Sequence, residues 1–150
     1  MTGVWVAVAV LVAATVFGLV RRRRDGVLRA APARAGTGAG KDGDDQVGDT
    51  LRPDELGADL GEKATLVQFS SAFCAPCRAT RRVLGEVAGM VDGVAHVELD
   101  AEAHLELVRR LNVVRTPTVL ILDGAGRVVR RAAGAPRKAD VIAALGVAIP

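Results

Sequence analysis

The residues of this chain best suited to chemistry are two cysteines, Cys74 and Cys77, which are separated by two residues. The 150 residues contain no other cysteine. A structural disulfide framework in a small domain normally uses more cysteines spread along the chain, and a bridge that closes so short a loop constrains the unfolded chain little. The spacing therefore favours a redox-active pair, in which one thiolate attacks a disulfide and the second thiol releases the mixed disulfide.

Two other interpretations of the cysteine pair are weaker. The spacing could be fortuitous, or the pair could be half of a metal site shared between two molecules. The second idea is disfavoured because the sequence offers only two sulfur ligands and no histidine near them. We predict no metal and no other cofactor. His96 and His104 are interpreted as surface or structural residues.

The elements around the pair must place its sulfur atoms at the start of a helix. An apolar run of strand-forming residues at 65–69 precedes the cysteines, and a helical pattern follows them to about Met90. Cys74 then lies at the helix N-terminus, where unpaired backbone N–H groups and the helix dipole favour a thiolate. Cys77 lies one turn deeper, and Pro76 occupies the first turn, where its missing N–H costs nothing.

The rest of residues 51–150 predicts an alternation of helices and strands. Strands are expected at 94–99, at 118–122 and, as an edge strand after a hairpin turn, at 127–131; helices are expected at 53–60, after the capping residue Asp100, and at 136–145. Arg130 and Arg131 fit the protection of an edge strand, and Glu98 fits solvation of a strand end. The order is βαβ, a helix, then ββα, which predicts an α/β domain with one parallel pair and one antiparallel hairpin.

Two segments of the sequence resemble the thioredoxin family. The segment 69–77, Phe-Ser-Ser-Ala-Phe-Cys-Ala-Pro-Cys, is similar to the family's active-site segment, and Val114-Arg-Thr-Pro117-Thr is similar to the loop that carries its cis-proline. The resemblance covers about residues 51–145. It implies a thioredoxin-like fold, with a central mixed sheet flanked by helices. It also implies that Pro117 follows a cis bond and exposes the backbone of Thr116 beside Cys74, where an extended substrate can form main-chain hydrogen bonds.

The sequence departs from the family pattern at three positions near the cysteines. Phe73 stands where the family usually has Trp, and Ala75 stands where it commonly has Gly. We expect Phe73 to flank the site as an apolar contact surface for substrate. Gln68 occupies the place of a buried Asp that is thought to help deprotonate the second cysteine. Because Gln68 cannot take a proton, this replacement bears on how fast Cys77 is activated.

The N-terminus carries an apolar segment long enough to cross a membrane. Residues 4–20 contain no charged side chain, and from Met1 the segment reaches the ~20 residues that span a bilayer. Four arginines, 21–24, follow at once. A cleaved signal peptide would instead have its positive charge before the apolar run. Since arginine-rich flanks tend to stay in the cytoplasm, we expect a single-pass anchor at 1–20, with the N-terminus outside and the rest of the chain inside.

Residues 21–50 are interpreted as a basic flank and a flexible linker between the anchor and the domain at 51–150. The linker is rich in Gly, Ala and Asp and shows no strand or helix periodicity. Its stretch 36–41 fails the phosphate-loop pattern, because Asp42 stands where Ser or Thr is required. The net charge of +3 is concentrated beside the apolar segment, and no aromatic residues alternate with basic ones in the domain, which argues against nucleic-acid binding.

These observations predict a membrane-tethered thiol–disulfide oxidoreductase that reduces protein disulfides through Cys74 and Cys77. Its partners would be disulfide-containing proteins and an upstream thiol reductant. Two alternatives stay open. If the anchor is inverted, the domain is an extracytoplasmic oxidoreductase; if the cysteines do not turn over, it is a redox-inert interaction module.

Overall fold

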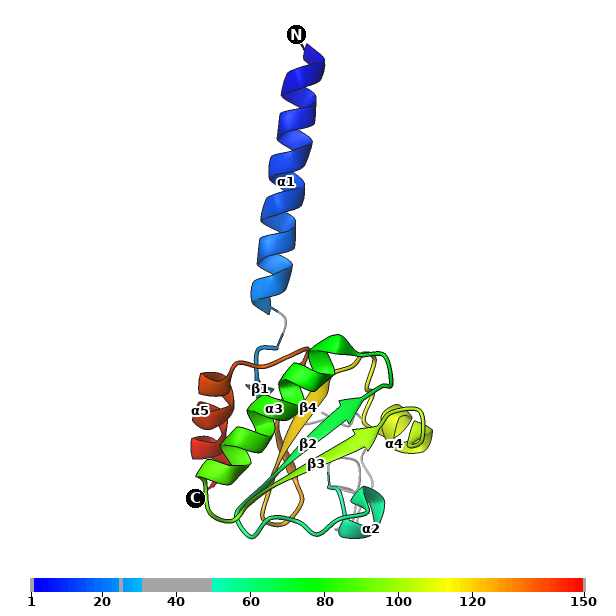
Figure 1. Cartoon of the computed structure of the whole chain (residues 1–150), viewed down its shortest axis with the longest axis vertical. Coiled ribbons are helices and arrows are strands. Elements are labelled where there is room, and N and C mark those ends of the chain that lie inside the picture. Colours follow the sequence, from blue (N-terminus) through cyan, green and yellow to red (C-terminus); the bar gives the residue numbers. More distant parts are fainter. Residues whose placement is uncertain (1, 25, 31–49, 150) are drawn as a thin grey trace, which may run out of the picture.

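Within the residues that the computed structural model describes, 2–24, 26–30 and 50–149, five strands form one sheet (Figure 1). The strands are β1 (Arg29–Ala30), β2 (Ala64–Ser70), β3 (Val94–Asp100), β4 (Thr118–Asp123) and β5 (Val128–Ala133). Their order across the sheet is β1-β5-β4-β2-β3. β2 pairs in parallel with β3, and all other pairings are antiparallel. The predicted mixed sheet is therefore confirmed.

Helices flank both faces of the sheet. They are α2 (Pro53–Leu56), α3 (Ala75–Met90), α4 (Leu105–Arg110) and α5 (Lys138–Ala148), whereas α1 (Thr2–Arg24) extends away from the sheet (Figure 1). The apolar cluster on one face contains side chains from α3 and α5, including Leu84 and Val141. The cluster on the other face contains Leu56 of α2 and Leu107 of α4. The sheet thus separates two apolar layers, with α3 and α5 side by side on one of them (Figure 1).

The central strands β2 and β4 are buried along their whole length. Successive side chains of a strand point to opposite faces, so Leu66 joins the cluster under α3 while Val67 and Phe69 join the opposite one. A strand buried on both faces has a nearly continuous apolar sequence, and the run at 118–122 in β4 predicts such a central strand, whereas β2 also carries the buried polar residue Gln68. This arrangement holds the end of β2, and therefore the start of α3, rigidly in the sheet.

The expected edge strand is not at the edge. β5 is paired on its outer side with β1, in a register that places Arg29 opposite Arg131 and Ala30 opposite Arg130. The Arg131 side chain does not protect an edge, because its guanidinium donates hydrogen bonds to the carbonyls of Leu111 and Asn112. A strand of two residues has no periodicity, so no pattern in the sequence indicates that this part of the expected linker pairs with the sheet.

Several helix ends also differ from the prediction. Asp100 ends β3 rather than capping α4, whose N-cap is His104, and the Asp100 carboxylate accepts a hydrogen bond from the backbone N–H of Glu102 at 3.0 Å. α5 begins at Lys138 and continues to Ala148, two residues past Gly146. A glycine in a helix costs about 1 kcal/mol relative to Ala, which the burial of neighbouring Leu145 and Ala148 offsets.

α1 is long and apolar enough to cross a membrane. Its most apolar window, Val4–Arg21, has a mean hydropathy of 2.2 and is not buried by the rest of the chain. A signal sequence near an N-terminus has the same length and composition, so α1 is a candidate span. The parts of the predicted linker at 31–49, including the rejected phosphate-loop stretch, lie outside the described residues.

Candidate redox site

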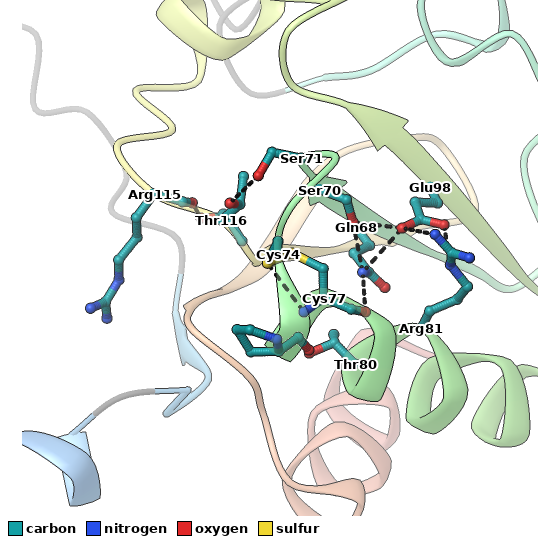
Figure 2. The surroundings of a disulfide bond; sticks show 12 residues. Gln68, Ser70, Ser71, Cys74, Cys77, Thr80, Arg81, Glu98, Arg115 and Thr116 are labelled. Atoms are coloured by element: carbon teal, nitrogen blue, oxygen red, sulfur yellow. Dashed lines mark hydrogen bonds and ion pairs between the residues drawn. A yellow bond between two sulfur atoms is a disulfide. The ribbon is translucent and has the colours of Figure 1, made fainter.

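Cys74 and Cys77 form a disulfide at the N-terminus of α3, with their Cα atoms 5.2 Å apart (Figure 2). Cys74 is the N-cap residue of the helix, and its sulfur accepts a hydrogen bond from the backbone N–H of Cys77 at 3.2 Å. Cys74 is 9% exposed and Cys77 only 2%. The two sulfur atoms are therefore unequal: Cys74 Sγ is the one nearer to solvent and to the positive end of the helix dipole.

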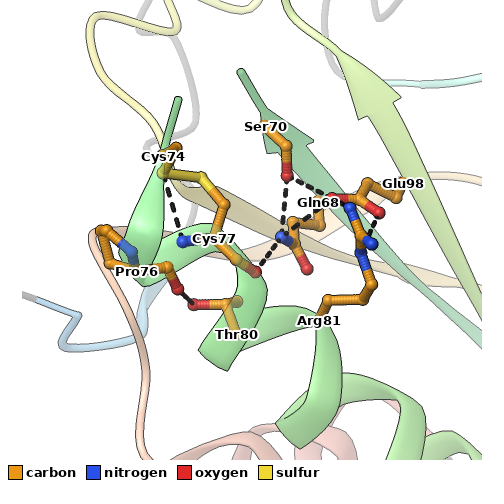
Figure 3. A network of polar contacts seen from close by, with 8 residues as sticks. All are labelled: Gln68, Ser70, Cys74, Pro76, Cys77, Thr80, Arg81 and Glu98. Atoms are coloured by element: carbon orange, nitrogen blue, oxygen red, sulfur yellow. Dashed lines mark hydrogen bonds and ion pairs between the residues drawn. A yellow bond between two sulfur atoms is a disulfide. The ribbon is translucent and has the colours of Figure 1, made fainter. Parts of the chain in front are cut away.

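The local sequence explains why the helix starts here. The buried strand β2 ends at Ser70, and a loop of three residues leads to the N-cap. Pro76 lies in the first turn, and its carbonyl accepts a hydrogen bond from the Thr80 hydroxyl at 3.0 Å (Figure 3). Pro76 is exposed, while Thr80 is buried under the turn. The Thr80 hydrogen bond thus holds the first turn of α3 on its buried side, while the side that carries the Pro76 ring faces solvent.

The expected cis bond is present between Thr116 and Pro117. The hydroxyls of Thr116 and Ser71 lie 3.0 Å apart, which joins the proline loop to the loop before Cys74 (Figure 2). The Pro117 carbonyl accepts a hydrogen bond from the Gly134 N–H at 2.7 Å. The loop is therefore connected on one side to the cysteine loop and on the other side to the end of β5.

A polar network lies beneath the cysteine pair. The Gln68 side-chain amide donates to the Cys77 carbonyl at 2.9 Å and to the Ser70 hydroxyl at 2.8 Å (Figure 3). The Ser70 hydroxyl in turn donates to a Glu98 carboxylate oxygen at 2.6 Å. Arg81, one turn after Cys77, donates to the same oxygen at 2.9 Å. The network joins β2, β3 and α3 directly below the redox pair.

Glu98 is the charged centre of this network. Partial burial acts to raise the pKa of its carboxyl, but the hydrogen bonds from Arg81 and Ser70 and the Arg81 charge outweigh burial, so the pKa lies below its ordinary value. Glu98 is therefore a carboxylate at neutral pH. Together with Arg81, it places a compensated pair of charges close to Cys77.

Two buried polar atoms beside the network have no hydrogen-bond partner among the described residues. They are Gln68 Oε1 and His96 Nε2. His96 and Glu98 are two residues apart on β3, and β3 pairs with β2 so that Gln68 lies opposite Glu98. Burial lowers the pKa of His96, with the Glu98 carboxylate acting against this. His96 is thus a partly buried neutral imidazole near the site, in agreement with a structural role.

A cavity of about 370 Å³ opens beside the disulfide. Its lining includes Cys74, Cys77, Arg78, Arg81 and Glu98. Both cysteines thus line a pocket whose wall also carries two arginine guanidinium groups and a glutamate carboxylate. Among the described residues, no group of three His, Cys, Asp or Glu side chains is arranged to hold a metal ion.

The structure brings together most of the residues that the sequence analysis selected. Cys74, Cys77 and Pro76 share the first turn of α3, and Thr116 and Pro117 lie beside it. Phe73 is 100% exposed next to Cys74, so it does not pack against the domain.

The prediction that Glu98 solvates a strand end is wrong, because its carboxylate accepts hydrogen bonds from Ser70 and Arg81 below the cysteine pair. Ser70 was not selected, although the sequence contains a signal for both Ser70 and Glu98. Gln68 and Ser70 alternate in β2, as His96 and Glu98 do in β3, and polar residues two apart in an otherwise apolar strand share one face. From the sequence, Arg81 is expected only to add positive potential near the cysteines, together with Arg78 and Arg82. Its ion pair with Glu98 carries no sequence signal, because Arg81 lies on an exposed helix face.

Comparisons with known proteins agree with this geometry. The thioredoxin family model matches residues 50–146. The thioredoxin of Mycolicibacterium smegmatis is 34% identical over 105 residues, which are 67% of this chain and 89% of that protein. The thioredoxin of Mycobacterium tuberculosis is 35% identical over 89 residues, 59% of this chain and 76% of that protein. The bifunctional thioredoxin reductase/thioredoxin of Mycobacterium leprae is 33% identical over 89 residues, 59% of this chain, and the match spans only 19% of that longer protein.

Solved structures share the fold. A mutant thioredoxin from Halobacterium salinarum superposes with a TM-score of 0.54 at 18% identity, covering 59% of this chain and 77% of that one. A reduced thioredoxin pre-protein from Schistosoma mansoni superposes with a TM-score of 0.52 at 24% identity, covering 59% and 82%. The chain belongs to the thioredoxin family, and its Cys74–Cys77 pair supports thiol–disulfide oxidoreductase activity.

Proposed function

We propose that the chain is a membrane-tethered oxidoreductase that reduces disulfides in protein partners. The observation that carries the proposal is the position of the Cys74–Cys77 pair at the start of α3, beside the Thr116–Pro117 loop. A thiolate at a helix N-terminus is stabilised by the backbone N–H groups and the helix dipole. An uncharged Ala-Pro between the cysteines resembles reductases more than strong oxidants, so we assign the reducing direction.

The reaction starts from the dithiol. The Cys74 thiolate attacks one sulfur of the substrate disulfide, the substrate S–S bond breaks, and the departing substrate thiolate takes a proton. Cys77 then loses its proton and attacks Cys74 Sγ, which forms the Cys74–Cys77 disulfide and releases the second substrate sulfur as a thiol. Two electrons and two protons have passed to the substrate, and an upstream thiol reductant returns them. The roles follow exposure, since Cys77 is the more buried sulfur.

Substrate binding is assigned to the residues around Cys74. The backbone of Thr116 is proposed to pair with an extended substrate segment. The exposed Phe73 ring and the exposed Pro76 ring provide apolar contacts on the other sides of the attacking sulfur. These contacts would select polypeptide disulfides over small-molecule disulfides, because a small molecule cannot reach all of them at once.

The anchor is assigned to residues 1–20, the basic flank and linker to 21–50, of which Arg29 and Ala30 pair with the sheet as β1, and the catalytic domain to 51–150. Arginines 21–24 favour a cytoplasmic position for the domain. The test is protease treatment of sealed inside-out and right-side-out vesicles that contain the full chain. Cleavage of the domain only in inside-out vesicles supports the assignment. Cleavage only in right-side-out vesicles means that the domain is extracytoplasmic, and release of the whole chain by alkaline washing means that α1 is no anchor.

The activity is tested with the full chain in detergent. Reduction of insulin disulfides is followed with a thiol reductant present, for the wild type and for Cys74→Ser. We expect catalysis by the wild type and only the uncatalysed rate with the variant. If a folded wild-type protein is no faster than Cys74→Ser, the enzymatic proposal is wrong, and the redox-inert interaction module takes its place.

A further inference from the structure

The segment that follows α1 is attached to the catalytic domain. The backbone N–H of Gly26 donates to the Ala133 carbonyl at 3.0 Å, and β1 continues the attachment by pairing with β5. Leu28 packs against the apolar cluster under α3 and α5. The chain leaving the candidate span is therefore part of the domain surface from Gly26 to Ala30.

At Gly26 the segment after α1 lies directly against the backbone of the domain. Its φ is +78°, and a Cβ atom at this position would lie 2.1 Å from the Ala135 carbonyl oxygen. A left-handed backbone conformation is readily adopted by glycine, and the close approach excludes any side chain. The contact therefore depends on glycine at this position.

The attachment point is at the same end of the domain as the redox site. The Ala133 carbonyl that accepts from Gly26 also accepts from the Arg115 guanidinium at 2.7 Å, and Arg115 precedes Thr116 of the proline loop. Ala133 also pairs with Thr118, the residue after Pro117. Figure 2 shows the segment after α1 passing on the Arg115 side of Cys74.

The direction of the chain through β1 and β5 determines which end of the domain lies toward α1. β1 is antiparallel to β5, and β5 ends at the redox site, so the chain runs away from the site after Gly26. In Figure 1 the end of the domain that carries the start of α3 is the end toward α1. The redox site and the exit from α1 therefore share one side.

Only a few residues separate the end of the apolar window of α1 from Gly26. The apolar window ends at Arg21, α1 continues to Arg24, and two further residues reach Gly26. With 1.5 Å per helical residue and at most 3.6 Å per extended residue, Gly26 lies no more than about 12 Å beyond Arg21. A span that ends at Arg21 would thus hold the attachment point, and the loop beside it, close to the bilayer surface.

From this geometry we infer that the redox site faces the membrane and acts on disulfides in the juxtamembrane segments of other membrane proteins. The inference rests on the proposed function, because it needs both the anchor and the reducing activity. The chemistry is unchanged: the dithiol passes two electrons and two protons to the substrate disulfide, and the upstream thiol reductant restores it. The membrane-facing site selects its substrates by the height of their disulfides above the bilayer.

The experiment uses the full chain in proteoliposomes with a thiol reductant. The probes are single-span peptides whose disulfide-closed loop lies either ~5 or ~40 residues beyond the span, on the same side as the domain. A site held near the bilayer raises the effective concentration of the near disulfide, and we expect it to be reduced about tenfold faster than the far one. Equal rates for the two probes, or faster reduction of the far probe, would overturn the inference.

Gly26→Val tests the attachment itself. We expect this variant to lose most of the preference for the near probe, while its reduction of insulin in detergent equals that of the wild type. Gly57→Val is the matched control, because Gly57 also has a positive φ, of +64°, yet has open space around it and caps α2. A full near-probe preference in Gly26→Val would show that the attachment does not orient the site.

The two proposals fail in different ways. A wild-type protein that does not reduce insulin in detergent contradicts the proposed activity. A wild-type protein that reduces insulin but reduces the near and far probes at equal rates contradicts only the inference that the redox site faces the membrane.

Discussion

The side-chain amide of Gln68 donates a hydrogen bond to the backbone carbonyl of Cys77 across 2.9 Å. A strand residue at the centre of the sheet thus holds the helix turn that carries the more buried sulfur. The same amide reaches the Ser70 hydroxyl, and through it the Glu98 carboxylate. The position below the redox pair is therefore occupied by a hydrogen-bond donor that does not titrate, and the nearest carboxylate of the network belongs to β3.

Replacing Gln68 by Asp should introduce a titrating group at this position. The new carboxyl would be buried and near the negative Glu98, and both effects raise its pKa. We expect an additional ionisation in the pH dependence of Cys77 alkylation in the reduced protein, and a loss of about 1–3 kcal/mol in unfolding free energy from the lost amide hydrogen bonds. Gln68→Asn, which cannot titrate, is the control. The same pH dependence in both variants would contradict the prediction.

Glu98 should make the domain less stable in acid. The pKa of its carboxyl is lowered in the folded state, so its stabilising effect is complete above the unfolded pKa and is lost as the pH falls through the folded pKa. We expect Glu98→Gln to lower the unfolding free energy at pH 7 by about 1 kcal/mol and to flatten its decline below about pH 4.5. Denaturant titrations from pH 7 to pH 3 measure both effects.

Part of the acid sensitivity should remain in Glu98→Gln, because the pKa values of Glu55 and Asp123 are also lowered. Glu86→Gln is the matched control: Glu86 is an exposed residue of α3 that pairs with Lys138. An unchanged pH profile in Glu98→Gln would show that the network does not depend on the carboxylate charge.

The two cysteines should differ in their trapping behaviour. Cys77→Ser keeps the more exposed sulfur but lacks the one that releases the intermediate, so it should accumulate a mixed disulfide with a protein substrate. Cys74→Ser should not, because its remaining sulfur is only 2% exposed. Non-reducing electrophoresis after incubation with a disulfide substrate distinguishes them. If both variants trap the substrate equally, the assignment of Cys74 as the attacking sulfur and Cys77 as the releasing sulfur is wrong.

Phe73 should contribute to substrate binding without contributing to stability. Because its side chain is fully exposed, Phe73→Ala should change the unfolding free energy by less than about 0.5 kcal/mol. We expect the KM for a protein disulfide to rise about fivefold, equivalent to ~1 kcal/mol of lost contact. Met90→Ala, an exposed apolar residue at the other end of α3, should leave the KM unchanged. A normal KM in Phe73→Ala would exclude this residue from the binding surface.

Arg131 should stabilise the domain more than its neighbour Arg130. The Arg131 guanidinium donates to the carbonyls of Leu111 and Asn112, which connects β5 to the end of α4, and burial lowers its pKa. Arg131→Ala should lower the unfolding free energy by about 1–3 kcal/mol, since two carbonyls lose a charged donor. In the part of the chain that the structure describes, the Arg130 side chain forms no hydrogen bond to the end of α4, so Arg130→Ala should change the unfolding free energy by less than about 0.5 kcal/mol. Similar effects of both variants would contradict this assignment.

The sequence by itself determined the chemistry and most of the elements. Two cysteines at a strand-to-helix boundary indicate exchange between a dithiol and a disulfide, because the helix N-terminus stabilises a thiolate. The apolar runs of β2 and β4 and the helical stripe of α3 are local patterns, and a local pattern can be read from neighbouring residues alone. The uninterrupted apolar run before the four arginines likewise indicated a candidate span.

Only the tertiary structure decided which distant residues meet. Ser70, Arg81 and Glu98 come from three elements: the parallel register of β2 with β3 brings Ser70 and Glu98 together, and the packing of α3 against the sheet adds Arg81. The pairing of β1 with β5 involves two residues and rests on a backbone contact at Gly26, so no periodicity could reveal it. Local patterns describe how a segment folds, whereas strand register and close backbone approach depend on partners far away in the chain, and these set both the polar network and the side of the domain on which the redox site lies.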